Sequence, residues 1–322
     1  MDEPFLYKYK PSLIKNMILP SHSISLIESL LKLPGISTIL LGNTGCGKST
    51  LASCIIKNYY PNTSLLLLND NILSINCLKD QGVQFYRTHL KAFCQTRSTI
   101  PGKRKTVLVD DIDTITPQCQ EVIRYCLDVY QDRINFICTA SNRHKVQEPI
   151  LSRCIAIKVP SPSRNDIIKL CNFIIEKEKL KITNEAYELL IKYSSNSYRL
   201  LINYLEKFKL LQQEITEDIL KFSCTNIHTE IFDKYLKNCL YKKDNFKQCL
   251  DQIYWLYEEG YSVTDIIDGL FSYLKYESKE PDHIRYKCIK QVCKYAAAHI
   301  IIHEHEVELA FLTLSLCNLK FN

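Results

Sequence analysis

Short apolar runs alternate with longer amphipathic stretches through the first half of the chain. The nearly continuous apolar runs cover residues 36–41, 64–68, 106–110, 134–139 and 155–159. Such runs are typical of strands that are covered on both faces, as in parallel sheets. Helical periodicity fills the intervals between the runs. The pattern predicts βαβ units that build a five-stranded parallel sheet.

Beyond residue 160 only helical patterns remain. Pro160 and Pro162 interrupt the alternation, because proline removes a backbone donor and restricts the residue before it. Ser163, Thr183 and Ser262 stand where helix N-caps are expected. We predict three domains: an α/β domain over residues 1–160, a helical domain over 161–225 and a second helical domain over 226–322.

One glycine-rich segment matches the P-loop pattern G-x-x-x-x-G-K-[ST] at every specified position. It consists of Gly42, Asn43, Thr44, Gly45, Cys46, Gly47, Lys48 and Ser49. A predicted strand precedes it and an apolar-periodic helix follows, which is the context that this motif requires. Backbone amides at the helix start bind phosphate oxygens, Lys48 neutralises their charge, and the Ser49 hydroxyl ligates Mg²⁺. The segment predicts a nucleotide site.

A second element of that site is an apolar strand that ends in aspartates. Asp110 closes the run 106–110, and Asp111 and Asp113 follow it. We expect Asp110 at the carboxyl edge of the sheet beside the magnesium ion. Asp111 then lies where a carboxylate orients or deprotonates the attacking water.

With these motifs the chain resembles the AAA+ clamp loader small subunits, the replication factor C family, over nearly its whole length. The resemblance implies a P-loop AAA+ domain with a parallel five-stranded sheet, then a helical lid and a helical collar for oligomerisation. Tyr9 and Pro11 resemble the K-Y-R-P opening of the family, which lies against the adenine of ATP together with Met17 and Ile18. Residues 110–113 are similar to its D-E-A-D box.

Two further boxes imply arginine roles. Residues 148–154 are similar to E-P-I-x-S-R-C, whose arginine, here Arg153, reaches the ATP site of the neighbouring subunit. Residues 196–203 resemble the lid box G-D-M-R-R-A-I-N, which makes Arg199 the sensor 2 candidate. Ser141 falls at the sensor 1 position, where Asn or Thr is typical, and the adjacent Asn142 is an alternative.

The resemblance also implies contacts with DNA. Residues 81–87 are similar to R-G-I-x-V-I-R, a helix that lines the DNA channel, with Gln81 in place of the first arginine and Arg87 as the second. Arg87 and Lys91 suit phosphates rather than bases. Residues 116–124 resemble T-x-x-A-Q-x-A-L-R, which implies that Gln120 and Arg124 relay DNA contact to the acidic box.

Composition agrees with an anionic partner for the first half of the chain. The 322 residues carry a net charge of +6, and residues 1–160 hold 19 Lys and Arg against 12 Asp and Glu. The remainder is close to neutral, which suits contacts with protein. Fifteen cysteines without a C-x-x-C pair predict free thiols rather than disulfides or a zinc site. No apolar run approaches a membrane span, and no secretory signal is visible.

The expected function is that of a subunit in a five-membered clamp loader, which binds ATP and Mg²⁺ and places a sliding clamp on primer-template DNA. We expect an intracellular location, in the nucleus or at a viral replication site. Asp111 stands where the family has Glu, one methylene longer, so hydrolysis at this site is less secure than binding. The alternatives are an ATP-holding structural subunit of the same ring and another P-loop ATPase of DNA replication.

Overall fold

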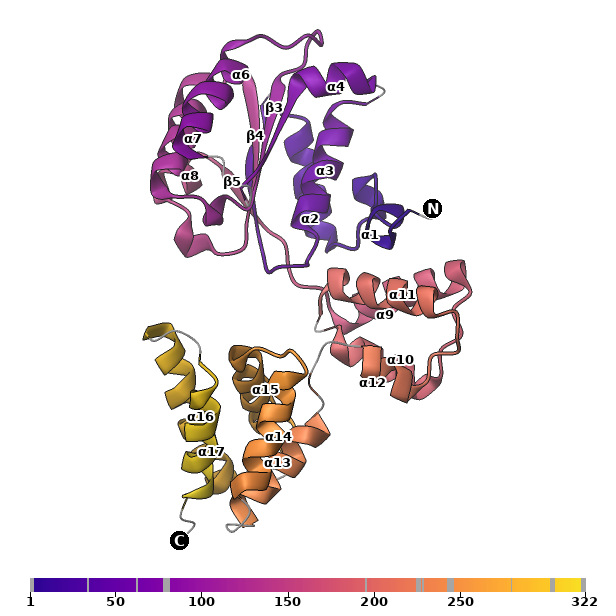
Figure 1. The fold of residues 1–322 in the computed structure, drawn as a ribbon. Helices are drawn as coiled ribbons and strands as arrows, with labels where there is room; N and C mark the ends of the chain where they lie inside the picture. The colour runs from indigo at the N-terminus through magenta and orange to yellow at the C-terminus, as the bar shows by residue number, and fades with distance from the viewer. Residues whose placement is uncertain are drawn as a thin grey trace. The chain divides into compact units, whose positions relative to one another are not determined.

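The computed structural model describes the chain apart from residues 1–2, 34, 62, 78–81, 195, 224–226, 228, 242–245, 279, 302–304 and 320–322. The chain divides into two compact units, Met1–Ser223 and Cys224–Asn322. The first unit holds the sheet and its surrounding helices, and the described part of the second is helical (Figure 1). The predicted domain boundary at residue 160 lies inside the first unit and stays a prediction.

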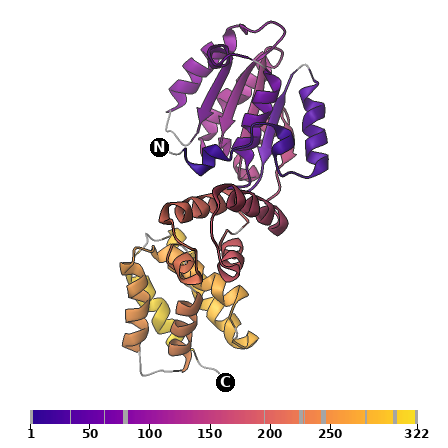
Figure 2. The same cartoon turned by 90° about the vertical axis from the view of Figure 1, so that its right-hand side faces the viewer.

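A five-stranded parallel sheet forms the centre of the first unit, as the sequence predicted. Its strands are β1 (Ser37–Leu41), β2 (Ile72–Asn76), β3 (Lys105–Asp110), β4 (Ile134–Ala140) and β5 (Ile155–Lys158). Their order is β2-β3-β4-β1-β5, and Figure 2 shows the strands side by side. Leu41 pairs with both Ala140 and Lys158, so the carboxyl ends of the three strands lie level at one edge.

Helices cover both faces of the sheet and enclose a separate core on each. On one face lie α2 (Ser21–Leu31) and α3 (Lys48–Tyr59), and on the other α7 (Pro117–Tyr130) and α8 (Glu148–Leu151) (Figure 1). The second face also carries a continuous helix of three parts, α5 (Gly82–Phe85), the π-helical η2 (Tyr86–Leu90) and α6 (Lys91–Gln95). Every residue of β4 is buried, which explains its unbroken apolar pattern.

The prediction of a strand at residues 64–68 is wrong. These residues begin α4 (Leu65–Asn71), and β2 starts at Ile72. Four consecutive leucines suit a helix, because leucine is among the best helix formers and has no β-branch. β2 instead contains the β-branched Ile72 and Ile75.

Asn71 fixes the junction between α4 and β2. Its side chain is fully buried and uses both ends of the amide. Nδ2 donates to the carbonyl of Leu67 at 2.7 Å and to Thr99 Oγ1 at 2.5 Å. Oδ1 accepts from Ser98 Oγ at 2.9 Å and from the Thr99 amide at 3.0 Å. The amide thus ties the α4 turn to the loop that precedes β3.

Four helices follow the sheet within the first unit. They are α9 (Arg164–Glu178), α10 (Asn184–Tyr193), α11 (Tyr198–Leu211) and α12 (Glu217–Ser223). Ser163 caps α9 in a reciprocal capping box with Asp166, and Thr183 caps α10. These starts confirm the helix N-caps that the sequence predicted. We refer to the four helices as the lid helices.

The second unit packs its helices around one apolar core. They are α13 (Thr229–Tyr241), α14 (Phe246–Glu258), α15 (Val263–Tyr276), α16 (Asp282–Ile301) and α17 (Val307–Cys317). A capping box of Ser262 and Asp265 starts α15. Gly269 in α15 faces the ring of Phe232, where an added Cβ would lie 2.9 Å from the ring edge. None of the helices described in either unit is long and apolar enough to cross a membrane.

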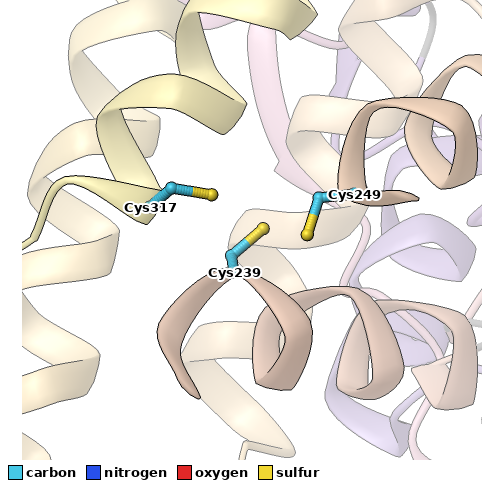
Figure 3. Close-up of side chains that lie close together, drawn as sticks. All are labelled: Cys239, Cys249 and Cys317. Atoms are coloured by element: carbon cyan, nitrogen blue, oxygen red, sulfur yellow. The ribbon is translucent and has the colours of Figure 1, made fainter. Parts of the chain in front are cut away.

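The cysteines of the described residues are free thiols, and all but Cys293 are buried. Cys239, Cys249 and Cys317 form one cluster, in which three helices bring the sulfur atoms within 4.8 Å of one another (Figure 3). No described histidine or carboxylate joins them, whereas structural zinc takes four ligands. Burial raises the pKa of the Cys239 thiol, so the cluster packs as neutral apolar groups.

We predict that Asn71→Ala lowers the free energy of unfolding by about 1–3 kcal/mol, because the substitution leaves buried donors and acceptors unpaired. Urea unfolding of the full chain measures the change. Asn69→Ala is the matched control, since Asn69 lies in the same helix and is exposed; we expect a change within about 0.5 kcal/mol. Equal effects of the two substitutions would contradict the role of Asn71.

Candidate nucleotide-binding site

The P-loop joins β1 to α3 at the carboxyl edge of the sheet. Gly45 and Gly47 have positive φ angles of 75° and 97°, a backbone conformation that residues other than glycine rarely adopt. The loop curls in this way so that α3 starts directly from it, with Gly47 at the N-cap. A curled loop before a helix N-terminus directs backbone amides toward one point and suits an anion.

Lys48 is buried inside this loop. Its side chain is 6% exposed, and Nζ donates to the carbonyl oxygens of Gly42 and Asn43, both at 2.9 Å. A third bond, 3.1 Å long, goes to Ser141 Oγ at the end of β4. These three oxygen atoms satisfy the three donors of the buried ammonium group. The cation is therefore held where the loop would receive phosphate oxygens.

A carboxylate and two hydroxyls meet beside the lysine. Ser49 Oγ donates to Asp110 Oδ1 at 2.9 Å, and Thr139 Oγ1 donates to the same oxygen at 2.6 Å. Ser49 lies in the first turn of α3, and Asp110 and Thr139 lie at the carboxyl ends of β3 and β4, so the three meet at one edge of the sheet. A carboxylate with a neighbouring hydroxyl supplies the hard oxygen ligands that Mg²⁺ prefers. The residues therefore fit a magnesium ion next to bound phosphate.

Thr139 is a residue of this site that the sequence analysis missed. Besides binding Asp110, its hydroxyl accepts the amide N–H of Asp111 at 2.9 Å. The signal was available, because the register that pairs Val109 with Cys138 places Thr139 level with Asp110. Using it requires knowledge that β3 and β4 are neighbours, which periodicity alone does not give.

Asp111 has an unusual backbone and an unusual acidity. Its φ and ψ of 56° and 52° are left-handed, a conformation that aspartate tolerates better than most residues. Burial raises the pKa of its carboxyl group, and the nearby carboxylate of Asp110 raises it further. The charges of Lys48 and Arg199 oppose this shift. A carboxyl group with a raised pKa suits a general base.

The two sensor 1 candidates differ in their surroundings. The amides of Ser141 and Asn142 both donate to the carboxylate of Asp113, at 3.2 Å and 2.9 Å. The Ser141 hydroxyl accepts a hydrogen bond from Lys48 inside the site. The side chain of Asn142 instead accepts the amide of His144 at 3.0 Å and caps the short helix η4 (Arg143–Lys145). The structure thus brings Ser141 into the site and uses Asn142 locally.

The lid helices reach the P-loop through the start of α11. The Tyr198 amide donates to the Gly45 carbonyl at 3.1 Å. A Cβ added to Gly45 would lie 2.1 Å from Ser197 Oγ and 3.7 Å from the Cβ of Arg199. Only glycine fits at this contact. Arg199 therefore stands beside the P-loop, as expected for a residue that senses the nucleotide.

The four residues assigned to the adenine lie in different surroundings. The methyl group of Met17 is 3.8 Å from the position of a Cβ on Gly47, so Met17 borders the P-loop. Cys54 Sγ in α3 donates to the Pro11 carbonyl at 3.1 Å. Ile18 is half-buried beside Met17. Tyr9, in contrast, faces the lid and hydrogen-bonds to Glu178 at the end of α9.

Arg153 lies at the opposite edge of the sheet from the P-loop. It precedes β5, whose Ile155 pairs with Thr38 near the start of β1, whereas the P-loop follows the end of β1. At about 3.3 Å per residue, the strand length separates Arg153 from the P-loop of its own chain. Its side chain is 37% exposed; Nε bonds to Asp128, and a terminal nitrogen donates to the Pro149 carbonyl at 2.7 Å.

Gln120 and Arg124, the expected relay residues, have separate environments. Gln120 is 2% exposed and donates to the carbonyls of Ile112 at 3.3 Å and Lys145 at 2.9 Å. It thus joins the turn after the acidic box to the segment after Ser141. Arg124 pairs with Glu121 and Asp128 on its own helix, α7, rather than with the acidic box. The structure therefore places only Gln120 next to the site.

The predicted DNA residues lie on the helix 82–95. Arg87 is exposed, and the Lys91 ammonium lies 5.1 Å from the centre of the Tyr125 ring. Gln81 lies outside the described residues. The basic run 103–105 is largely engaged, because Arg104 donates to the Gln131 carbonyl and the buried Lys105 donates to Thr96.

Two family descriptions match the chain. Residues 36–156 match the family described as AAA domain, and residues 227–300 match the replication factor C C-terminal domain. A probable replication factor C subunit 2 of Dictyostelium discoideum is 26% identical over 299 residues, which cover 90% of this chain and 84% of the relative. The replication factor C subunit 4 of Saccharomyces cerevisiae is 25% identical over 291 residues, 90% of this chain and 88% of the relative.

Two solved structures of Thermotoga maritima proteins share the fold. The RuvB Holliday junction branch migration motor has a TM-score of 0.54 at 17% identity and covers 73% of this chain and 79% of its own. A DNA polymerase III gamma subunit-related protein has a TM-score of 0.54 at 15% identity and covers 92% and 98%. These likenesses confirm the predicted P-loop α/β fold with helical domains after it.

We predict that Thr139→Val weakens Mg²⁺-dependent nucleotide binding about 10- to 100-fold, because residues that orient metal ligands have effects of this size. Valine keeps the volume of threonine and removes the hydroxyl that bonds to Asp110 and Asp111. Magnesium titration in the presence of an ATP analogue measures the change. Thr139→Ser, which retains the hydroxyl, is the control; equal magnesium affinities for the two variants would contradict the assignment.

Proposed function

We propose that this chain, a clamp loader protein of the replication factor C small-subunit type, binds ATP and drives the loading of a sliding clamp on primer-template DNA. The observation that carries the proposal is the cluster at the carboxyl edge of the sheet. There Lys48, Ser49, Asp110 and Thr139 converge on the P-loop. The function follows the two family matches and the length over which the relatives align.

The P-loop amides and Lys48 hold the phosphates of ATP in this proposal. Ser49 and Asp110 hold Mg²⁺, which neutralises charge on the phosphate oxygens when bound. Arg199 approaches the terminal phosphate from the lid, and Ser141 approaches it from the end of β4. Met17, Ile18 and Pro11 line the adenine side. Each of these residues contributes binding and orientation rather than covalent chemistry.

Asp111 is the candidate for orienting the attacking water. Its raised pKa favours proton acceptance. The hydrogen bond from its backbone N–H to Thr139 Oγ1 fixes its backbone. Its side chain is one methylene shorter than the glutamate of the family pattern, so water must approach closer to the backbone. This difference favours a second candidate function, an ATP-holding structural subunit with little hydrolysis of its own.

Arg153 serves the ATP site of a neighbouring subunit. Its position at the far edge of the sheet suits a group that acts outside its own chain, and it is partly exposed. Guanidinium stays protonated and can bind two phosphate oxygens at once, so it stabilises the charge that develops during phosphoryl transfer. Hydrolysis then depends on assembly of the ring.

The second unit supplies the collar through which subunits associate. The outer face of α17 exposes Val307, Phe311 and Leu314 by 43%, 54% and 44%. Its inner face belongs to the core of the unit, so the helix is apolar on both sides. An exposed apolar stripe of this kind marks an interaction surface. We assign it to the collar of an adjacent subunit.

DNA and the clamp complete the proposed set of partners. Arg87 and Lys91 contact the phosphate backbone without reading sequence. Gln120 of α7 hydrogen-bonds to Ile112, after the acidic box, and to Lys145, after Ser141. It therefore suits a relay from the DNA-facing helix 82–95 to Asp111. Arg124 instead pairs with acidic neighbours. Clamp loading takes place where DNA is copied. We therefore assign the chain to the nucleus, or to a viral replication site in a host cell.

We predict that Arg153→Ala in the assembled ring slows ATP hydrolysis at the neighbouring site by about 10³-fold or more, the usual contribution of an arginine supplied in trans. Binding of ATP by the altered chain itself is expected to stay unchanged. Steady-state turnover with clamp and primed DNA, together with the mass of the purified complex, measures both points.

Arg164→Ala is the matched control for this experiment, because Arg164 is exposed and forms a surface ion pair with Glu188. Unchanged turnover in an intact Arg153→Ala ring would refute the trans role. Turnover that responds to neither clamp nor DNA would instead point to another P-loop ATPase of replication.

We predict that Asp111→Asn reduces turnover at this site and raises the stability of the fold at neutral pH. A raised carboxyl pKa means that folding disfavours the ionised form, so the carboxylate costs folding free energy above that pKa, and the neutral amide removes the cost. Thermal unfolding of both proteins over a pH series measures the gain, which we expect above the raised pKa and expect to lose as the pH falls through it. Unchanged turnover of the ring would favour the structural-subunit alternative.

A further inference from the structure

The N-terminal strap, residues 4–17, connects the lid helices to the P-loop helix α3. Its first part packs on the lid: the Phe5 amide donates to Glu206 in α11 at 3.2 Å, and the Tyr9 ring lies edge-on to Phe173 in α9, with centroids 6.1 Å apart. Phe5 is 5% exposed and is the buried side chain of an otherwise exposed segment. The strap therefore moves with the lid at this end.

The second part of the strap packs on α3. Lys10 Nζ donates to Ser53 Oγ at 3.1 Å, and the Pro11 carbonyl accepts from Cys54. Ser53 Oγ in turn donates to the carbonyl of Ser49, the last residue of the P-loop motif, at 2.8 Å. Only one residue of chain separates the lid contact of Tyr9 from the α3 contact of Pro11. A displacement of one end is therefore passed directly to the other.

Glu178 anchors the strap to the lid. It ends α9, its side chain is 8% exposed, and one of its oxygens binds both Lys8 Nζ, at 2.5 Å, and the Tyr9 hydroxyl. Lys209 of α11 lies 3.5 Å from the other oxygen. Bonds from Lys8 and Tyr9 hold the pKa of the Glu178 carboxyl below its ordinary value, so the group is ionised at neutral pH. It joins the strap to both α9 and α11.

We propose that Glu178 is a positioning residue that couples ATP binding to the position of the lid by holding Lys8 and Tyr9 of the strap against α9. This inference rests on the proposed function, since it assigns a role within the same ATP site. Without the carboxylate, the strap loses its charged attachment to the lid, and Pro11 and Met17 are less often in place on the adenine side. Affinity falls in proportion to the fraction of molecules in the competent arrangement.

A purely structural ion pair makes a different prediction. It would lower the thermal stability of the nucleotide-free protein and leave nucleotide affinity unchanged. The positioning role instead lowers affinity in a protein that is still folded. The two are separated by measuring both quantities on the same variants.

The test measures the Kd of the full chain for a fluorescent ATP analogue and the melting temperature without nucleotide. Glu178→Gln keeps the size and removes the charge; we expect the Kd to rise about tenfold, the effect of losing a charge-assisted hydrogen bond. Glu176→Gln is the matched control, because Glu176 is an exposed residue of the same helix. We expect it to leave the Kd within about twofold of the wild type.

Tyr9→Phe provides a milder variant that removes one hydroxyl and keeps the ring between Phe5 and Phe173. The double variant with Glu178→Ala should bind little worse than Glu178→Ala alone, because each change removes the hydrogen bond between Tyr9 and Glu178. Independent, multiplying effects would overturn the proposal, as would wild-type affinity in folded Glu178→Gln. A wild-type chain that fails to bind the analogue would refute the proposed function itself, which distinguishes the two failures.

Discussion

The site depends on one carboxylate, that of Asp110, which accepts hydrogen bonds from both Ser49 and Thr139. The two donors come from different elements, α3 and β4, and Asp110 itself ends β3. A parallel sheet is the reason that these residues meet, because it brings the ends of all its strands to one edge, where ligands bind in such folds. The P-loop, the acidic box and the residues after β4 therefore form one site although they lie far apart in the sequence.

Local motifs of the sequence predicted most of this edge. The P-loop pattern located Lys48 and Ser49, and the apolar run ending in aspartate located Asp110, because each motif is short and contiguous. Thr139 was missed, since its role follows from which strand lies next to β3. Glu178 was missed for a similar reason: nothing near it in sequence reveals that the N-terminal strap will bind there. Residues 64–68 were misread because a run of four leucines suits a buried strand and a buried helix equally well by periodicity.

The sheet also separates two kinds of function. Its carboxyl edge holds the groups to which we assign nucleotide binding, and its amino edge holds Arg153, which is bound to Asp128 and the Pro149 carbonyl. Under the proposed function, a single chain contains both halves of a site without being able to join them. Neighbouring subunits would then have a direction, since each would offer an amino edge to the carboxyl edge of the next. The lid, connected through the strap and through the contact between Tyr198 and Gly45, adds a second link within each chain.

The sulfur-rich interior has a consequence for handling the protein. Burial raises the pKa of Cys77 to about 11 and of Cys171 and Cys288 to about 12, so these groups are almost never thiolates in the native state and resist oxidation. An unfolded chain has fifteen thiols at ordinary acidity instead. On heating in air, disulfide formation between unfolded chains would then compete with refolding. Shelf life without a reductant is thus set by the height of the unfolding barrier rather than by the equilibrium between folded and unfolded chains.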